Sequence, residues 1–285
     1  MTMSENQTMP TMTFGTHTLS RLIAGSNCLN GGSHLSRFLN RQMRHYFTDE
    51  KVVEHLSDCY AHGITGWQSI SFNLRWYQML KDQGIPMQYI SLAQDTPDEP
   101  DMLERLVSAG TIAIAHHGEV TDVAFKNGNM NPIREYCKRV RETGVMVGVS
   151  THMPEVIDQI LSEDWDVDFF MCCVYERHRS REQLMKLLGD VPIPIPEVYL
   201  ENDPPRMFKM IRSTDKPCLA FKILAAGRLC EKQETVEQAF QDTLSSIKTN
   251  DGIIIGMYPE YENQVELNSN YVKKYSHLSK PYSKG

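Results

Sequence analysis

Short apolar runs alternate with longer helical patterns along almost the whole chain of 285 residues. Each run is nearly continuous in apolar side chains, which is typical of a strand buried on both faces. There are eight such runs, the number of strands in a closed parallel barrel. The predicted strands span residues 22–25, 66–70, 88–92, 111–115, 145–149, 167–171, 218–223 and 252–255.

The segments between these runs carry the marks of amphipathic helices. Thr48 is placed to cap one helix and Gly63 to end it, and Thr151 is placed to cap another. Strand and helix alternate without a break, so the pattern predicts an α/β protein with one (β/α)₈ TIM barrel domain. We expect this domain to span residues 11–285, after a disordered tail at residues 1–10.

Charge and cysteine content narrow the class of protein. The net charge of −7 and the lack of a basic stripe argue against nucleic acid and anionic membranes as partners. Neither a signal peptide nor a membrane-spanning run stands out, and a leader cleaved from a longer precursor is an open alternative. Seven cysteines without a C-x-x-C spacing indicate free thiols in a reducing compartment. We therefore expect a cytoplasmic protein with a small-molecule substrate and leave its oligomeric state open.

Several stretches resemble the aldo-keto reductase family in chain order. Residues 13–22 are similar to the hairpin that closes the barrel floor in that family, and residues 148–157 are similar to its "GVSN…PE" strand and helix. The remaining similar stretches are residues 166–175, 222–227 and 254–268. The match covers nearly the whole chain with the correct spacing. The resemblance implies a barrel of the aldo-keto reductase type in a divergent branch of the family.

Most of the family's residues for hydride transfer do not carry over. The resemblance places Gln68 where the family has its aspartate, and residues 92–94 where it has its lysine. Tyr77 is the nearest tyrosine, but its neighbours do not match the family pattern. The family's histidine is retained as His116 or His117. Without the Lys–Asp pair, no positioned group lowers the pKa of a tyrosine toward neutral pH.

The expected nicotinamide contacts are also changed. Thr151 stands in place of the family's asparagine, and Cys172 lies near the position of its glutamine. The loop at residues 257–262 is acidic where a basic cluster would bind the extra phosphate of NADP, and acidic side chains repel phosphate. We therefore expect NADP to bind weakly or not at all, and we assign no cofactor-binding residues.

Polar residues near the carboxyl ends of the predicted strands define the candidate site, because active sites of these barrels form there. The catalytic candidates are His116, His117, His152 and Lys222; the substrate-binding candidates are Asn27, Gln68, Gln94 and Thr151; His34 and Glu197 could reach in from loops. Adjacent strand residues point to opposite sides, so one of the two neighbouring histidines should face the mouth. The loops at residues 27–47 and 176–205 should wall it.

Each candidate has a structural alternative. Lys222, within an apolar run, could serve as a base or form a Schiff base, or it could form an ion pair across the barrel. His117 could be a hydrogen-bonded loop residue, and His152 could help to cap the helix at Thr151. His117, His152 and a carboxylate such as Glu176 or Glu197 would together make a two-histidine, one-carboxylate set for a divalent metal. This set rests on fold position alone.

Three functions fit these observations. The first is a non-redox lyase, isomerase or hydrolase that uses acid–base or metal-assisted chemistry on a small polar carbonyl or sugar-like substrate. The second is an oxidoreductase with an altered nicotinamide site, and the third is a non-catalytic barrel that binds a ligand. The fold alone cannot choose among them, because this barrel hosts many chemistries.

Overall fold

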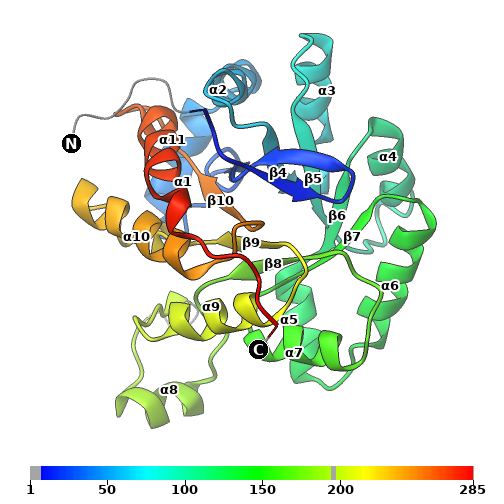
Figure 1. Cartoon of the computed structure of the whole chain (residues 1–285), viewed down its shortest axis with the longest axis vertical. Coiled ribbons are helices and arrows are strands. Elements are labelled where there is room, and N and C mark those ends of the chain that lie inside the picture. The colour runs from blue at the N-terminus through cyan, green and yellow to red at the C-terminus, as the bar shows by residue number, and fades with distance from the viewer. Residues whose placement is uncertain (1–7, 194–196, 285) are drawn as a thin grey trace.

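The computed structural model describes residues 8–193 and 197–284, and within these ranges eight parallel strands close into a barrel (Figure 1). Their order is β10-β3-β4-β5-β6-β7-β8-β9, and β9 pairs with β10 to complete the ring. The strands are β3 (Leu22–Gly25), β4 (Gly66–Ile70), β5 (Gln88–Ala93), β6 (Ala113–His116), β7 (Met146–Thr151), β8 (Phe169–Cys173), β9 (Cys218–Phe221) and β10 (Gly252–Gly256).

Helices surround this ring on the outside (Figure 1). Those in the described ranges are α1 (Arg37–Tyr46), α2 (Asp49–Ala61), α3 (Leu74–Asp82), α4 (Met102–Ala109), α5 (Gly118–Lys126), α6 (Asn131–Glu142), α7 (Pro154–Ser162), α8 (Arg181–Leu188), α9 (Asp203–Ser213), α10 (Gln233–Ser246) and α11 (Gln264–Tyr275). The predicted (β/α)₈ barrel is confirmed, and each apolar run overlaps the strand that it predicted.

The bounds of two strands differ from the prediction for a common reason. The runs at residues 111–115 and 167–171 each begin two residues before the strand does. The first residues of these runs belong to turns, because the N–H of Thr111 bonds Leu106 O and the N–H of Val167 bonds Trp165 O. Apolar pattern alone cannot separate a buried turn from the strand that follows it.

A hairpin closes the amino-terminal end of the barrel, as the sequence predicted. Strands β1 (Thr11–Phe14) and β2 (His17–Ser20) pair antiparallel, and in Figure 1 they lie across the barrel in dark blue. Phe14 packs edge-on against Phe169 of β8 with ring centroids 4.8 Å apart. Ahead of the hairpin, Pro10 O accepts a hydrogen bond from Arg21 N, and residues 1–7 of the predicted tail lie outside the described residues.

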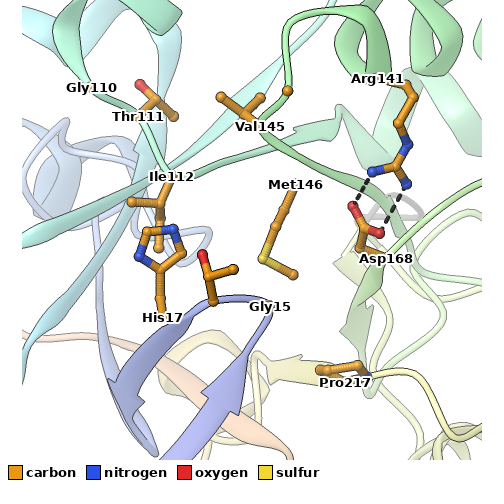
Figure 2. Close-up of a pocket in the computed structure, with 12 residues that line it drawn as sticks. Gly15, His17, Gly110, Thr111, Ile112, Arg141, Val145, Met146, Asp168 and Pro217 are labelled. Carbon is orange, nitrogen blue, oxygen red and sulfur yellow. Dashed lines mark hydrogen bonds and ion pairs between the residues drawn. The ribbon is translucent and has the colours of Figure 1, made fainter.

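The same end carries a surface hollow beside the hairpin (Figure 2). Arg141 of α6 forms two hydrogen bonds of 2.9 Å to the carboxylate of Asp168, just before β8. Asp168 also accepts a 2.7 Å hydrogen bond from the backbone N–H of Val147. These contacts tie a helix to the first residues of two strands, so they support the framework at the end opposite the mouth.

The helix caps agree with the sequence in one case and differ in another. Thr48 caps α2, since its hydroxyl accepts from Lys51 N at 3.3 Å, and Gly63 follows the helix with φ of +86°. Thr151 was predicted to cap α7, but this is wrong, because the N-cap is Met153. Strand β7 continues through Thr151, and its hydroxyl is used in a buried contact described below.

The cysteines and the helix hydropathy bear on two further expectations. The seven cysteines all fall within the described ranges and are free thiols, as their odd number and spacing predicted. Among the helices of those ranges, none combines the length and the apolar character that crossing a bilayer requires. The cytoplasmic location stays a prediction.

Candidate active site

A cavity of about 460 Å³ opens at the carboxyl ends of the barrel strands. Six residues that the sequence singled out line it: Asn27, His34, Gln68, His117, His152 and Lys222. Residues 27–47, which include α1, supply much of one wall, and Arg177 contributes from the loop at residues 176–205. The volume is in the range of pockets that hold small ligands.

His116 and His117 diverge, as the alternation of side chains predicts. His116 ends β6 and faces the helices, where its Nδ1 lies 2.8 Å from Thr121 Oγ1 and its ring packs edge-on against Tyr136. His117 is the N-cap residue of α5 and lines the cavity. Its Nδ1 is buried and has no hydrogen-bond partner among the described residues. Only His117 of the pair is therefore available to a ligand in the cavity.

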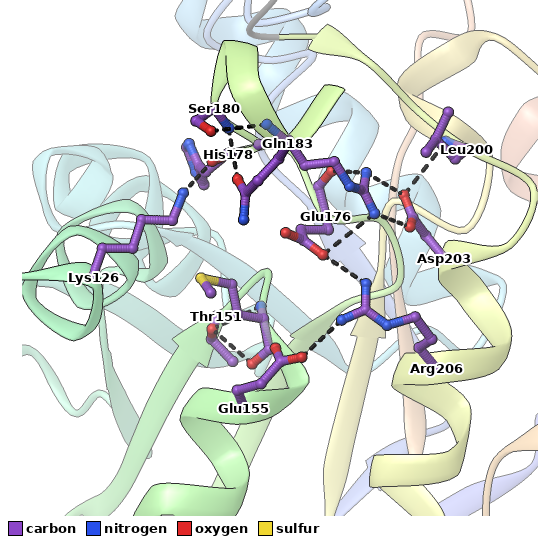
Figure 3. A network of polar contacts seen from close by, with 12 residues as sticks. Lys126, Thr151, Glu155, Glu176, His178, Ser180, Gln183, Leu200, Asp203 and Arg206 are labelled. Atoms are coloured by element: carbon purple, nitrogen blue, oxygen red, sulfur yellow. Dashed lines mark hydrogen bonds and ion pairs between the residues drawn. The ribbon is translucent and has the colours of Figure 1, made fainter. Parts of the chain in front are cut away.

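Glu176 does not reach the predicted metal site. Its carboxylate accepts a 2.7 Å hydrogen bond from Arg206 and a 3.3 Å one from Arg179, within the polar network of Figure 3. Both arginines bind further carboxylates, Glu155 for the first and Asp203 for the second. Glu176 thus joins α7, α9 and the loop after β8 instead of facing His117.

The predicted set of His117, His152 and Glu176 is therefore not assembled. Across residues 8–193 and 197–284, the group of three whose ligand atoms lie within 4.8 Å of one another is Asp122, His152 and His178. Two more sequence candidates lie off the cavity wall: Gln94 follows β5, and Thr151 ends β7 with its side chain turned toward α5.

A buried aspartate holds His152 in place. Asp122 of α5 has a side chain that is 1% exposed, and its Oδ2 lies 2.7 Å from His152 Nδ1. The backbone N–H of His152 donates to the same oxygen at 3.2 Å, and the Thr151 hydroxyl donates to Oδ1 at 2.5 Å. Three donors fix this carboxylate, so the imidazole ring has one orientation, with its Nδ1 edge turned away from the cavity.

Sequence reasoning missed Asp122 because nothing marks a lone acidic residue inside a short helix. The close approach of α5 to β7 makes the contact possible. A Cβ on Gly118, the first residue of α5, would lie 2.8 Å from Ser150 Oγ of β7. A glycine at the start of the helix was the available signal, because it permits such close packing.

Burial sets the protonation states of this pair. It raises the pKa of Asp122 to about 6 and lowers the pKa of His152 well below its ordinary value of 6.5. Near neutral pH the carboxylate is ionised and the imidazole is neutral, so Nδ1 carries the proton that Asp122 accepts. Nε2 then keeps its lone pair and makes no hydrogen bond to any described side chain or backbone group. This is the arrangement of a general base held by an aspartate.

Lys222 lies at the start of a strained turn. The sequence placed it inside a strand, but β9 ends at Phe221, and Lys222 has φ of +60°. Ala225 and Ala226 follow with φ of +48° and +53°. Non-glycine residues in this region of backbone conformation cost free energy, and such strain is concentrated at functional sites.

The Lys222 ammonium has no ion-pair partner among the described carboxylates, so the alternative of an ion pair across the barrel is not realised. Burial lowers the pKa of Lys222 below its ordinary value of 10.5. Its neighbour Phe221 packs edge-on against His152 with centroids 5.7 Å apart. Lys222 and His152 therefore line the same cavity, at the ends of β9 and β7, which flank β8.

The two long loops are connected across the mouth by Glu197. His34 Nδ1 lies 3.1 Å from Glu197 Oε1, and Arg177 Nη2 lies 2.7 Å from the same oxygen. Asn27 Nδ2 continues the chain of contacts at 3.2 Å from His34 Nε2. The loops after β3 and β8 are thus held together on the cavity wall, as their lengths led us to expect.

No protein-family model and no curated protein sequence matches the chain. Among solved structures, it is similar to a truncated 3-deoxy-D-arabino-heptulosonate 7-phosphate synthase from Thermotoga maritima, with a TM-score of 0.57 and 12% identity over 95% of this chain and 92% of that one. It is also similar to the glycerol dehydrogenase of Gluconobacter oxydans, an aldo-keto reductase, with a TM-score of 0.50 and 12% identity over 97% and 98%. The dihydropteroate synthase of Yersinia pestis gives a TM-score of 0.50 with 10% identity over 95% and 98%.

These neighbours are barrel enzymes of several types. At such identities they show the barrel fold and nothing of the reaction. One of these neighbours is an aldo-keto reductase, but its TM-score is no higher than those of the other enzymes. The comparisons therefore support a TIM barrel and not a particular family of TIM barrels.

Proposed function

We propose that the cavity at the mouth is the active site of a non-redox enzyme acting on a small polar carbonyl compound. In this account Lys222 forms an imine with the substrate carbonyl, and His152 moves the proton on the adjacent carbon. One observation carries the proposal: one cavity is lined both by an amine that has no ion-pair partner in residues 8–193 and 197–284 and by a histidine that a buried aspartate orients. The reaction class is that of an isomerase or lyase.

Lys222 is suited to the first step because burial favours its neutral form. The lone pair on Nζ attacks the carbonyl carbon, and the carbonyl oxygen takes up a proton. Loss of water from the resulting carbinolamine leaves an iminium, whose positive charge makes the C–H bond on the adjacent carbon more acidic. The covalent bond also fixes the substrate beside His152.

His152 performs the second step. Its Nε2 takes a proton from the carbon next to the iminium, and the electron pair of that C–H bond moves into the iminium to give an enamine. Asp122 stabilises the imidazolium that forms, because the Nδ1 proton already points at its carboxylate. Return of the proton to the opposite face of the same carbon gives an epimerisation, which is an isomerase reaction. If the enamine electron pair instead forms a double bond to the next carbon and expels a hydroxyl group from it as water, the result is a lyase reaction. In both cases water then hydrolyses the iminium, which releases the product and restores the Lys222 amine.

The remaining wall residues would bind the polar groups of the substrate. Asn27 and Gln68 offer amide groups to hydroxyls, and His117 offers a second imidazole that is not engaged through Nδ1 by the described residues. We assign His117 to proton transfer at the substrate oxygen. Gln94, Thr151 and His116 are outside this assignment, because their side chains lie away from the cavity wall.

Solvent exchange tests the proposal without knowledge of the natural substrate. The wild-type protein in D₂O should exchange the α-protons of at least one member of a panel containing pyruvate, dihydroxyacetone and glyceraldehyde, as followed by ¹H NMR. His152→Gln should slow exchange by ~10²–10⁴-fold, since a positioned base is removed. Lys222→Arg should do the same, because arginine keeps the charge and cannot form the imine.

The matched control is His62→Ala, which removes a partly exposed histidine paired with Asp58 of α2. It should exchange protons at the wild-type rate. Exchange that survives both His152→Gln and Lys222→Arg would remove the proposed chemistry from this cavity.

A further inference from the structure

His178 presents a buried nitrogen that no described group satisfies. Its Nε2 has no hydrogen-bond partner within the described ranges and lies 3.7 Å from Asp122 Oδ2. The ring stands nearly perpendicular to that of His152, with centroids 5.0 Å apart. Buried polar atoms in native proteins normally have partners, so an unsatisfied nitrogen facing a carboxylate and a second imidazole needs an explanation.

We propose that Asp122, His152 and His178 form a transition-metal site behind the catalytic base, with zinc as the metal that fits best. The three ligand atoms, Oδ2, Nδ1 and Nε2, all lie within 4.8 Å of one another. Ligands of tetrahedral zinc at about 2.0–2.1 Å from the metal lie roughly 3.3 Å apart. The 3.7 Å separation of His178 from Asp122 must close slightly, and the 2.7 Å separation of His152 from Asp122 must open by a similar small amount.

The ligand set selects the type of metal. Two imidazoles and one carboxylate suit zinc and its neighbours in the first transition series, whereas calcium and magnesium require mostly oxygen ligands. Only one of the three ligands is anionic, and Lys126 lies close by, with its Nζ hydrogen-bonded to His178 O. A site with so little negative charge disfavours hard cations that bind mainly by charge.

Metal at this position would control the base, a consequence that rests on the proposed function. In the metal-free state His152 holds its proton on Nδ1 and keeps a lone pair on Nε2. A metal bound at Nδ1 displaces that proton, so the neutral ring carries its proton on Nε2. The atom that faces the substrate is then a donor and cannot accept a proton from carbon. Zinc is therefore a reversible inhibitor.

Binding is tested directly with the metal as probe. Cobalt added to the metal-free protein should give a visible absorption band with a stoichiometry of one, and zinc should displace it in a calorimetric titration. His178→Ala and His178→Asn should each weaken binding by at least ~10-fold, as expected for removal of a ligand. His62→Ala should bind like the wild type, because His62 follows α2 and does not belong to the group of Asp122, His152 and His178. Equal cobalt binding by wild type and both His178 variants would overturn the proposal.

A second measurement does not depend on how the variants fold. X-ray absorption at the zinc edge of the loaded wild-type protein should show two imidazoles and oxygen ligands in the first shell. A shell with sulfur would assign the metal to cysteines and overturn the site.

A separate experiment tests whether zinc inhibits the proposed reaction. Zinc should stop α-proton exchange in the wild type and should slow it far less in His178→Ala, when each protein is compared with its own metal-free rate. If neither protein exchanges protons, the proposed function fails, while the cobalt and absorption results still decide the metal site. If both proteins are inhibited alike, metal acts elsewhere and the switch at His152 is wrong.

Discussion

His116 and His117 are neighbours in the sequence with opposite surroundings in the structure. His116 is packed between α5 and α6 with a hydrogen bond to Thr121, whereas His117 lines the cavity and its Nδ1 has no hydrogen-bond partner in the described part of the chain. His152 and Lys222 resemble His117 in this respect. Both line the cavity, and among the described residues His152 Nε2 has no hydrogen-bond partner and Lys222 Nζ has no ion-pair partner. The residues that we propose to act on the substrate are therefore those with a nitrogen atom that the described residues leave without a partner.

The two histidines should respond differently to truncation. His116→Ala should lower the free energy of unfolding by ~1–3 kcal/mol, because it removes buried packing and one of the two hydrogen-bond contacts of the Thr121 hydroxyl. His117→Ala should change stability little and should slow α-proton exchange. Urea denaturation and exchange rates measured on both variants check the contrast. The reverse pattern would make His116 the functional residue.

Lys222 should lower stability while it supports activity. Its pKa falls on folding, so the folded state binds the proton less tightly than the unfolded state. Stability should therefore increase as the pH rises from the lowered value toward 10.5. Lys222→Met should melt at a higher temperature than wild type at pH 7, with no activity, and its advantage should shrink as the pH rises. A lower melting temperature for Lys222→Met at pH 7 would show that the ammonium has a stabilising partner.

At the scale of elements, the strand order determines which residues lie near the mouth, and the helices and loops determine which of these side chains face the cavity. The strand runs were readable because burial on both faces leaves a continuous apolar pattern, and the positions of His117 and His152 followed from the strand ends. Asp122 could not be predicted, because its contact depends on how closely α5 approaches β7 at Gly118. Glu176 is near a strand end, but Arg179 and Arg206 bind its carboxylate away from His117. The spacing of residues in the sequence does not show such ion pairs.

Glu197 joins the two loops across the mouth, so the stability of the protein should fall when this carboxylate is protonated at low pH. Burial acts to raise the pKa of Glu197, but the hydrogen bond from His34 and the charge of Arg177 hold that pKa at about 2. A carboxylate with a depressed pKa stabilises the fold above its ordinary pKa of 4.5 and loses this contribution as the pH falls toward 2.

Glu197→Gln should therefore melt below the wild type near neutral pH, and the difference should vanish between about pH 4.5 and pH 2. Melting temperatures of the two proteins across this range provide the measurement. Glu54→Gln, in an exposed pair with Lys51, is the control and should show little difference at any pH. A constant gap between Glu197→Gln and wild type down to pH 2 would contradict the ionic link.

At the scale of the whole molecule, the two ends of the barrel have separate roles. The hairpin and the Arg141–Asp168 pair close the amino-terminal end, while the cavity opens at the other. The fold was predictable because all eight strands share one pattern. The arrangement of side chains at the mouth was less predictable, because it depends on contacts that the loops make in three dimensions.

The rim of the mouth argues against nicotinamide binding. The loop at residues 257–262 exposes Glu260 and Glu262, which hydrogen-bond Tyr258 and Gln233 and present negative charge to the solvent. NADPH carries phosphates that these carboxylates repel. Fluorescence titration should show no saturable binding of NADPH at micromolar concentration. Saturable micromolar quenching would restore the reductase hypothesis.

The central claim is that Lys222 forms an imine with a carbonyl substrate. Borohydride reduces an iminium to a stable secondary amine, so it records the intermediate as added mass on one lysine. Wild-type protein incubated with the carbonyl panel and then reduced should show the adduct on the peptide that contains Lys222, in preference to the exposed Lys138. Lys222→Arg should show no adduct at position 222. Labelling of the exposed lysines alone, or equal labelling of all lysines, would contradict the account.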